Sequence, residues 1–273
     1  MTNDSYKHKI AEIDELLAEG CHSVDTQAEL CFRRGCWLSR AEQYEAALTN
    51  YDKALELKPD DYRVWNNRGL VLESLDRNKE AIASYDKSLE LQPDQYQAWK
   101  NRGITLGNYK EAIISFDNAL EFDPDPHIVW HKRGIALDEL CQYEEAITNY
   151  DKALEINPNY SYSWGTRGMA LGELGRHEEA IASYDKLLEI HPDDHQGWSY
   201  RGFSLYELQR YKEALASYDK ALELNPTDDE VWHNRGVVLH KLSRAQEAII
   251  SYDRALRINP TYTDNWYSHS SVM

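Results

Sequence analysis

A repeat with a period of 34 residues dominates the sequence and limits the folds that it can adopt. Tryptophan, glycine and proline each recur at one position of this period. The tryptophans are Trp65, Trp99, Trp130, Trp164, Trp198, Trp232 and Trp266, spaced 34, 31, 34, 34, 34 and 34 residues apart. The glycines are Gly35, Gly69, Gly103, Gly134, Gly168, Gly202 and Gly236, and the prolines are Pro59, Pro93, Pro124, Pro158, Pro192, Pro226 and Pro260. A fixed period of this length indicates stacked copies of one small unit rather than ordinary globular domains.

Each copy predicts two helices, as residues 195–228 illustrate. A first apolar stripe with helical spacing contains Trp198, Gly202, Leu205 and Leu208. A second stripe contains Ala214, Tyr218, Ala221 and Leu222, and Pro226 ends it. The small residues in both stripes let the two backbones approach closely, while the tryptophan and tyrosine supply apolar area that neither helix can bury alone.

The combined pattern resembles the tetratricopeptide repeat family. It reads W-x2-R-G-x2-L, then E-A-I/L-x2-Y-D-x-A-L-E, then proline, and it covers residues 28–262, with part of an eighth copy to about 269. The resemblance implies an all-α, right-handed superhelical solenoid of about seven helix–turn–helix units whose first helices line a concave groove that recognises partners. The predicted units are 28–61, 62–95, 96–126, 127–160, 161–194, 195–228 and 229–262. One departure is an arginine before each glycine, where the family usually has an apolar residue.

The two ends of the array predict caps. Residues 1–27 are expected to form a capping helix and loop, with the helix from about Tyr6 to Glu19 and Gly20 as a left-handed end. Thr26 and Glu29 form a capping box that predicts the start of the next helix at Thr26. Residues 263–273 predict a partial eighth first helix that serves as the C-terminal cap.

The unit at 96–126 is three residues shorter than the others. Its first helix is therefore expected to end near Leu106. Such a change is tolerated at a junction between helix and turn, and this is the simpler interpretation. The alternative is a notch in the groove wall that admits a side chain of a ligand.

The composition excludes several classes of protein. No apolar run is long enough to span a membrane, and the first ten residues lack the apolar core of a secretory signal, so the expected location is the cytoplasm. The four cysteines lack zinc spacing and are expected to be free thiols. A formal net charge of -17 argues against binding to nucleic acid. Counted over the family's groove positions, acids and bases nearly cancel, which places the excess negative charge on the convex surface.

The sequence contains few residues whose spacing would suit metal binding or catalysis. His127 and His131 lie four residues apart, as two metal ligands on a helix would, but no third ligand is suggested, and surface histidines are the simpler interpretation. No phosphate-binding glycine loop, nucleophile elbow or isolated carboxylate pair occurs. We therefore expect no catalytic residues, no metal and no cofactor, and the chain is not expected to be an enzyme.

Seven arginines recur together with seven aspartates. The arginines are Arg34, Arg68, Arg102, Arg133, Arg167, Arg201 and Arg235, and the aspartates are Asp52, Asp86, Asp117, Asp151, Asp185, Asp219 and Asp253. They could form a ladder that binds acidic peptides. The favoured interpretation is an ion pair between helices, with Arg201 paired to Asp219 or a neighbouring aspartate and its stem on Trp198, because scaffold contacts repeat whereas ligand contacts vary.

Groove positions that differ between units predict the binding site. The candidate residues in the first half donate hydrogen bonds, and those in the second half are mostly large and apolar. They are Asn67, Lys100, Asn101, His131, Lys132, Tyr162, Met169, Tyr200, Phe203, Tyr206, His233 and Asn234. An open alternative is that Met169 and Phe203 only pack between neighbouring first helices.

The sequence therefore predicts a non-enzymatic scaffold that binds a peptide or a segment of a partner protein in the groove. The alternative is a self-associating assembly module whose terminal repeats or acidic convex surface form the interface. An enzyme or an RNA reader built on helical repeats is disfavoured by the acidic balance and the absent chemistry. A protein partner is expected, with neither nucleic acid nor membrane insertion.

Overall fold

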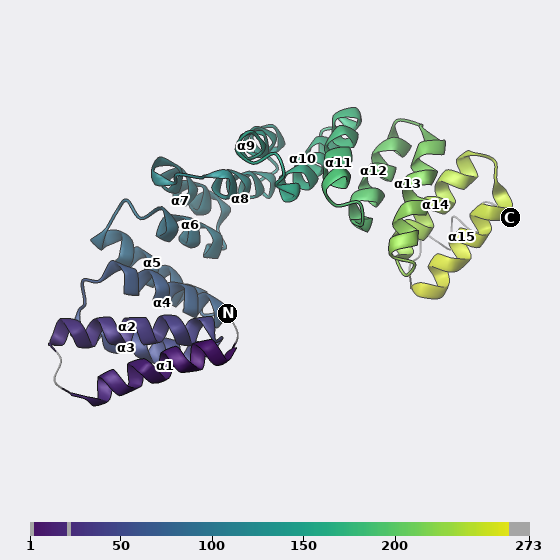
Figure 1. Cartoon of the computed structure of the whole chain (residues 1–273). Coiled ribbons are helices and arrows are strands. Elements are labelled where there is room, and N and C mark those ends of the chain that lie inside the picture. The colour runs from purple at the N-terminus through teal and green to yellow at the C-terminus, as the bar shows by residue number, and fades with distance from the viewer. Residues whose placement is uncertain (1–2, 21–22, 262–273) are drawn as a thin grey trace. The chain divides into compact units, whose positions relative to one another are not determined.

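The computed structural model describes residues 3–20 and 23–261, and these form fifteen α-helices and no strand (Figure 1). The first helix, α1, spans Asn3–Ala18. The remaining helices are α2 Val24–Arg40, α3 Tyr44–Leu57, α4 Tyr62–Ser74, α5 Asn78–Leu91, α6 Tyr96–Thr105, α7 Tyr109–Phe122, α8 His127–Asp138, α9 Tyr143–Ile156, α10 Ser161–Glu173, α11 His177–Ile190, α12 His195–Glu207, α13 Tyr211–Leu224, α14 Asp229–Lys241 and α15 Ala245–Ile258.

From α2 onward the even-numbered helices, called A helices here, each precede an odd-numbered B helix. In α2/α3, α4/α5, α6/α7, α10/α11, α12/α13 and α14/α15 the two helices pack against each other, and α3, α5, α9, α11 and α13 also pack against the next A helix. The expected all-α array of helix pairs is thus confirmed. The chain divides into two compact units, residues 1–136 and 137–273.

A glycine of the A helix meets an aromatic ring of the B helix in six of these pairs. The pairs are Gly35 with Tyr51, Gly69 with Tyr85, Gly103 with Phe116, Gly168 with Tyr184, Gly202 with Tyr218, and Gly236 with Tyr252. A Cβ atom on any of these glycines would lie 2.4 to 2.8 Å from the ring. The recurring glycine is therefore required by a close helix crossing, as the sequence predicts for Gly202.

In five repeats the tryptophan of the A helix connects the helix pair to the preceding turn. Its indole Nε1 donates a hydrogen bond to the carbonyl of the proline that ends the previous repeat, as from Trp65 to Pro59 at 2.8 Å and from Trp198 to Pro192 at 3.0 Å. The same bond forms in three further repeats, from Trp99, Trp164 and Trp232. The recurring six-residue spacing between proline and tryptophan thus reflects one repeated contact.

The arginines join neighbouring repeats. Arg201 Nε donates to Asp185 Oδ1 of the preceding repeat at 2.6 Å, and its Nη1 donates to Ser217 Oγ of its own B helix at 2.8 Å. Asp219 instead accepts from Arg235 of the next repeat. Pairing of Arg201 with Asp219 is therefore wrong, whereas pairing with a neighbouring aspartate is confirmed. The guanidinium lies 5.9 Å from the Trp198 ring, so the expected packing on tryptophan is present.

The arginine set predicts a measurable coupling between repeats. Arg201→Ala is expected to lower the free energy of unfolding by about 1 to 2 kcal/mol, because buried Ser217 loses its donor and Asp185 loses its ion pair. In double-mutant cycles by urea unfolding, Arg201→Ala and Asp185→Ala should couple by about 1 kcal/mol, whereas Arg201→Ala and Asp219→Ala should be additive to within about 0.5 kcal/mol. Equal coupling in both cycles would contradict the inter-repeat assignment.

Helix α1 supplies the contacts that a preceding repeat would supply. Its Asp14 accepts from Arg34 Nε at 2.6 Å, and Ile13 is buried at the start of the core. The predicted capping helix is therefore present, although it begins at Asn3 rather than Tyr6, and Gly20 has the expected positive φ of 71°. The predicted partial eighth helix at 263–273 lies outside the described residues.

The predicted start of the second helix at Thr26 is wrong. Helix α2 begins at Val24, and Ser23 is its N-cap, with Oγ accepting from the Thr26 backbone N–H at 3.2 Å. Ser23 Oγ accepts from the Thr26 N–H that the Glu29 side chain would accept from in the predicted capping box, so Ser23 is the N-cap and the helix begins earlier.

The shortened repeat loses the end of its A helix, as predicted. Helix α6 has 10 residues, against 13 in α4, α10, α12 and α14. Leu106 follows it in an extended conformation, and Asn108 caps α7 by accepting from the backbone N–H groups of Lys110 and Glu111. The three-residue deletion therefore shortens α6 and leaves the start of α7 normally capped.

Candidate functional site

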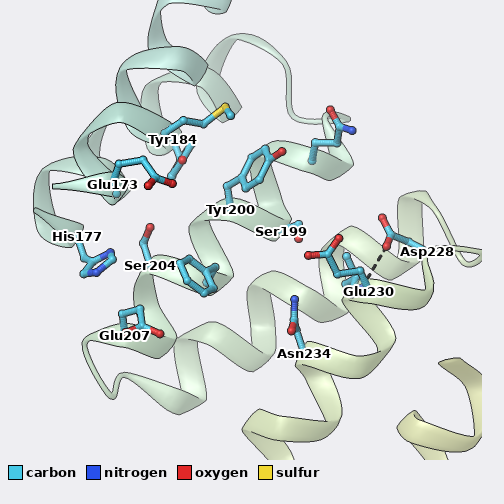
Figure 2. Close-up of a pocket in the computed structure, with 15 residues that line it drawn as sticks. Glu173, His177, Tyr184, Ser199, Tyr200, Ser204, Glu207, Asp228, Glu230 and Asn234 are labelled. Atoms are coloured by element: carbon cyan, nitrogen blue, oxygen red, sulfur yellow. Dashed lines mark hydrogen bonds between the residues drawn. The ribbon is translucent and has the colours of Figure 1, made fainter. Parts of the chain in front are cut away.

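The unit at 137–273 contains an open cleft on its A helices, shown in Figure 2. Helices α10, α12 and α14 supply most of its walls, and its volume is about 570 Å³. It is lined by Met169, Gly172, Glu173, His177, Tyr184, Gln196, Ser199, Tyr200, Phe203, Ser204, Glu207, Asp228, Glu230, Val231 and Asn234. Helix α12 packs against both α10 and α14, so the cleft spans neighbouring repeats.

A second hollow of about 590 Å³ adjoins this cleft. The two share Met169, Gln196 and Tyr200. The remaining lining residues of the second hollow are Ser161, Tyr162, Gly165, Thr166, Leu187, His191, Asp193, Asp194, His195 and Gly197. Because they share lining residues, we treat them as one surface, the α12 groove.

Large apolar side chains face solvent in the α12 groove. Phe203 is 47% exposed, Met169 43% and Tyr200 40%. The Tyr200 ring stacks on Tyr184 with ring centres 5.9 Å apart, and the rings of Phe203 and His177 form a T-shaped pair with centres 6.3 Å apart. Met169 and Phe203 are therefore not confined to packing between A helices, and the groove presents supported aromatic rings to a ligand.

The cleft shown in Figure 2 is acidic. Four carboxylates line it, and none of the described lining residues is lysine or arginine. Asp228 caps α14 by accepting from the Val231 backbone N–H at 3.1 Å. Within the described part of the chain, the side-chain carboxylates of Glu173, Glu207 and Glu230 make no hydrogen bond or ion pair. The sequence predicts a nearly neutral groove, from a count of acidic and basic residues at the groove positions of the whole chain. This is wrong for the α12 groove, because the basic residues in that count lie mostly in the first half of the chain.

Glutamates on the B helices differ from these three. Near the start of four B helices a glutamate pairs with the arginine three residues before it, as Glu213 does with Arg210 at 2.6 Å. Near the end of three B helices it pairs with a lysine, as Glu223 does with Lys220 at 2.7 Å. These seven glutamates of the B helices are thus neutralised locally, whereas the three of the cleft are not.

The unit at 1–136 has a cleft of different chemistry between α4 and α6, called the α4–α6 cleft. Its volume is about 480 Å³, and its lining includes Asn66, Asn67, Lys100 and Asn101 and no carboxylate among the described residues. Lys100 Nζ lies 5.9 Å from the centre of the Tyr96 ring. This cleft offers mainly amide and ammonium donors.

The predicted binding residues fall into three groups. Asn67, Lys100 and Asn101 line the α4–α6 cleft, and Tyr162, Met169, Tyr200, Phe203 and Asn234 line the α12 groove. His131 and His233 are buried, Lys132 is half-buried on α8, and Tyr206 packs against Tyr211 with ring centres 5.7 Å apart. These last four side chains line neither cleft.

Three carboxylates, Glu173, Glu207 and Glu230, were missed as site residues. Each occupies a groove position in the sequence, but a count over the whole chain balances them against distant bases such as Lys100. Counting acidic and basic residues separately for each pair of neighbouring units would have revealed these three carboxylates.

His127 and His131, expected to be surface histidines, are not exposed: His127 is half-buried and His131 is buried. His127 Nδ1 lies 2.8 Å from Asp125 Oδ1, and His131 is only 4% exposed. Residues 3–20 and 23–261 contain no group of three or more potential ligands that could hold a metal ion. Burial, together with the nearby Lys132 and His127, lowers the pKa of His131 to about 4, so its ring is neutral at physiological pH.

Family models match almost the whole array. Models described as Tetratricopeptide repeat match residues 32–96, 80–127, 127–160, 149–182 and 230–262, and one described as TPR repeat matches 202–243. The chain belongs to the tetratricopeptide repeat (TPR) family. A model described as Protein prenyltransferase alpha subunit repeat also matches this TPR protein, over residues 177–208, which contain α11 and α12.

Solved TPR structures resemble the array. YrrB, described as a TPR protein with an unusual peptide-binding site, is 26% identical with a TM-score of 0.59, covering 71% of this chain and 97% of YrrB. The C-terminal part of a TPR protein from Cytophaga hutchinsonii is 18% identical with a TM-score of 0.70, covering 85% and 95%. MamA is 22% identical with a TM-score of 0.58, covering 61% and 92%. No curated protein matches the sequence.

These findings support a protein-interaction scaffold as the general function of this TPR protein. The repeats supply stacked helix pairs with open clefts on their A helices. Among the described residues no helix has the length and apolar character that crossing a bilayer requires.

Proposed function

We propose that this TPR protein is a non-enzymatic scaffold that binds a segment of a partner protein in the α12 groove. The observation that carries the proposal is the row of solvent-exposed Met169, Tyr200 and Phe203 in a cleft of about 570 Å³. Aromatic side chains in a concave site contribute much of the binding energy at protein interfaces. The description of YrrB as a peptide-binding TPR protein supports the same class of ligand.

The α4–α6 cleft has a separate role in this proposal. Asn67, Lys100 and Asn101 can donate hydrogen bonds to backbone carbonyls or a carboxylate of a bound segment. Lys100 is only half-buried, so dissolved ions can screen its charge. Its contribution to the binding free energy should therefore be small and should decrease as salt is added.

The proposal is tested with a partner recovered by affinity capture on the intact chain. Tyr200→Ala with Phe203→Ala is expected to weaken binding of the purified partner by about 2 kcal/mol, because both rings lose their contact with the ligand. Isothermal titration calorimetry measures the change, after circular dichroism has shown that the variant is folded.

Phe122→Ala is the matched control, because Phe122 is 45% exposed but lines neither cleft. Its binding should equal that of the unmodified protein. The groove is not the binding site if the Tyr200 and Phe203 variant binds the partner normally, or if charge reversal of Glu213 and Glu223 on α13 weakens binding instead.

Self-association through the C-terminal end is a second candidate function. Ile250 and Ile258 on α15, the last described helix, are 57% and 38% exposed, which favours an apolar contact there. Sedimentation velocity should then show association that increases with concentration and is lost in Ile250→Lys. A monomer at every concentration would exclude this function and leave the groove as the interaction surface.

A further inference from the structure

We propose that the α12 groove takes a basic segment of its partner, with arginine side chains placed against the carboxylates of Glu173, Glu207 and Glu230 along the cleft. This inference rests on the proposed function, since it names the chemistry of the segment that the groove binds. Figure 2 shows Tyr200 between Glu173 and Glu230, so the exposed ring and the carboxylates face the same space.

The charge of the groove selects a cation. The carboxylates of the three glutamates lack a hydrogen bond or ion pair within the described residues, whereas seven glutamates of the B helices pair with arginine or lysine. The adjoining hollow adds Asp193 and Asp194 and, among its described lining, no lysine or arginine. An acidic segment would bring further negative charge to these carboxylates, whereas a basic segment supplies the missing counter-charge.

The aromatic lining favours arginine over lysine. A planar guanidinium can stack on an aromatic face and still donate in its own plane to carboxylates, whereas an ammonium is more strongly hydrated and lacks the flat shape. The protein already uses this combination: Arg235 lies 5.6 Å from the Trp232 ring while its Nε donates to Asp219 at 2.6 Å. Tyr200 and Phe203, beside three glutamates, offer a ligand the same two kinds of contact.

The test uses a fluorescein-labelled peptide, Gly-Leu-Arg-Leu-Arg-Gly, and the same peptide with both arginines replaced by citrulline. Citrulline keeps the shape of arginine but carries no charge. Fluorescence anisotropy at low salt should show the arginine peptide binding at least about tenfold more tightly, with the difference decreasing as salt is added. A lysine peptide should bind with intermediate affinity.

Matched glutamine variants locate the site. Glu173→Gln with Glu230→Gln should weaken binding of the arginine peptide about tenfold, whereas Glu189→Gln with Glu223→Gln, which removes the same charge from two B helices, should change it less than about twofold. Equal losses in the two variants would overturn the inference, because they would indicate non-specific attraction to an acidic protein.

The outcomes also separate this inference from the proposed function. If the citrulline peptide binds as tightly as the arginine peptide and both depend on Tyr200 and Phe203, the groove binds peptides but the inferred basic specificity is wrong. If captured partner and both peptides bind independently of Tyr200 and Phe203, the proposed function itself fails.

Discussion

Gly168→Ala should lower the free energy of unfolding by about 1 to 3 kcal/mol. The added Cβ would lie 2.6 Å from Cε1 of Tyr184, a ring that is buried between α10 and α11. Neither the ring nor the helix backbone can move without disturbing the packed core. Urea unfolding followed by circular dichroism measures the loss.

Gly172→Ala, one turn later on α10, is the matched control. A Cβ at this position meets no atom within 4 Å. Alanine should therefore stabilise the helix by up to about 1 kcal/mol through its higher helix propensity. Equal effects of the two substitutions would contradict the assignment of Gly168 to a close crossing.

Acidification should destabilise the protein through His131. The pKa of this buried histidine is lowered to about 4 from an ordinary value of 6.5, so the folded state holds the neutral ring while the unfolded state gains a proton as the pH falls. The stabilisation is complete above pH 6.5 and is lost between about pH 6.5 and 4. Integrated from pH 7 to pH 4, the loss is about 2 to 3 kcal/mol.

His131→Gln isolates this effect from the titration of surface carboxylates. Both proteins should lose stability in acid, but the unmodified protein should lose about 2 to 3 kcal/mol more than the variant between pH 7 and pH 4. Urea unfolding across this pH range provides the comparison. Parallel curves for the two proteins would show that His131 titrates normally and is not buried in solution.

The sequence predicts the helix pairs well because their determinants are local. Trp198, Gly202 and Tyr218 recur at fixed spacings, and each makes the same contact in most described repeats. The partner of Arg201 was less predictable, because Asp185 and Asp219 recur with the same period. Only the packing of consecutive repeats distinguishes a contact to the preceding B helix from one to its own.

The candidate site was predictable in part for a related reason. Variation at groove positions identified Tyr200 and Phe203, which the structure places in one cleft. The same criterion selected His131 and His233, which are buried. A groove position on an A helix can also face its own B helix, as His233 does with its ring centre 5.6 Å from that of Tyr252. The periodic pattern alone does not distinguish these two environments.

Hydrogen–deuterium exchange with and without the captured partner tests the central claim, that the A helices of residues 161–241 form the binding surface. Binding should protect backbone amides in α10, α12 and α14, which supply most of the walls of the α12 groove, and leave α13 and α15 nearly unchanged. Protection confined to α13 and α15, with α10, α12 and α14 unaffected, would contradict the claim.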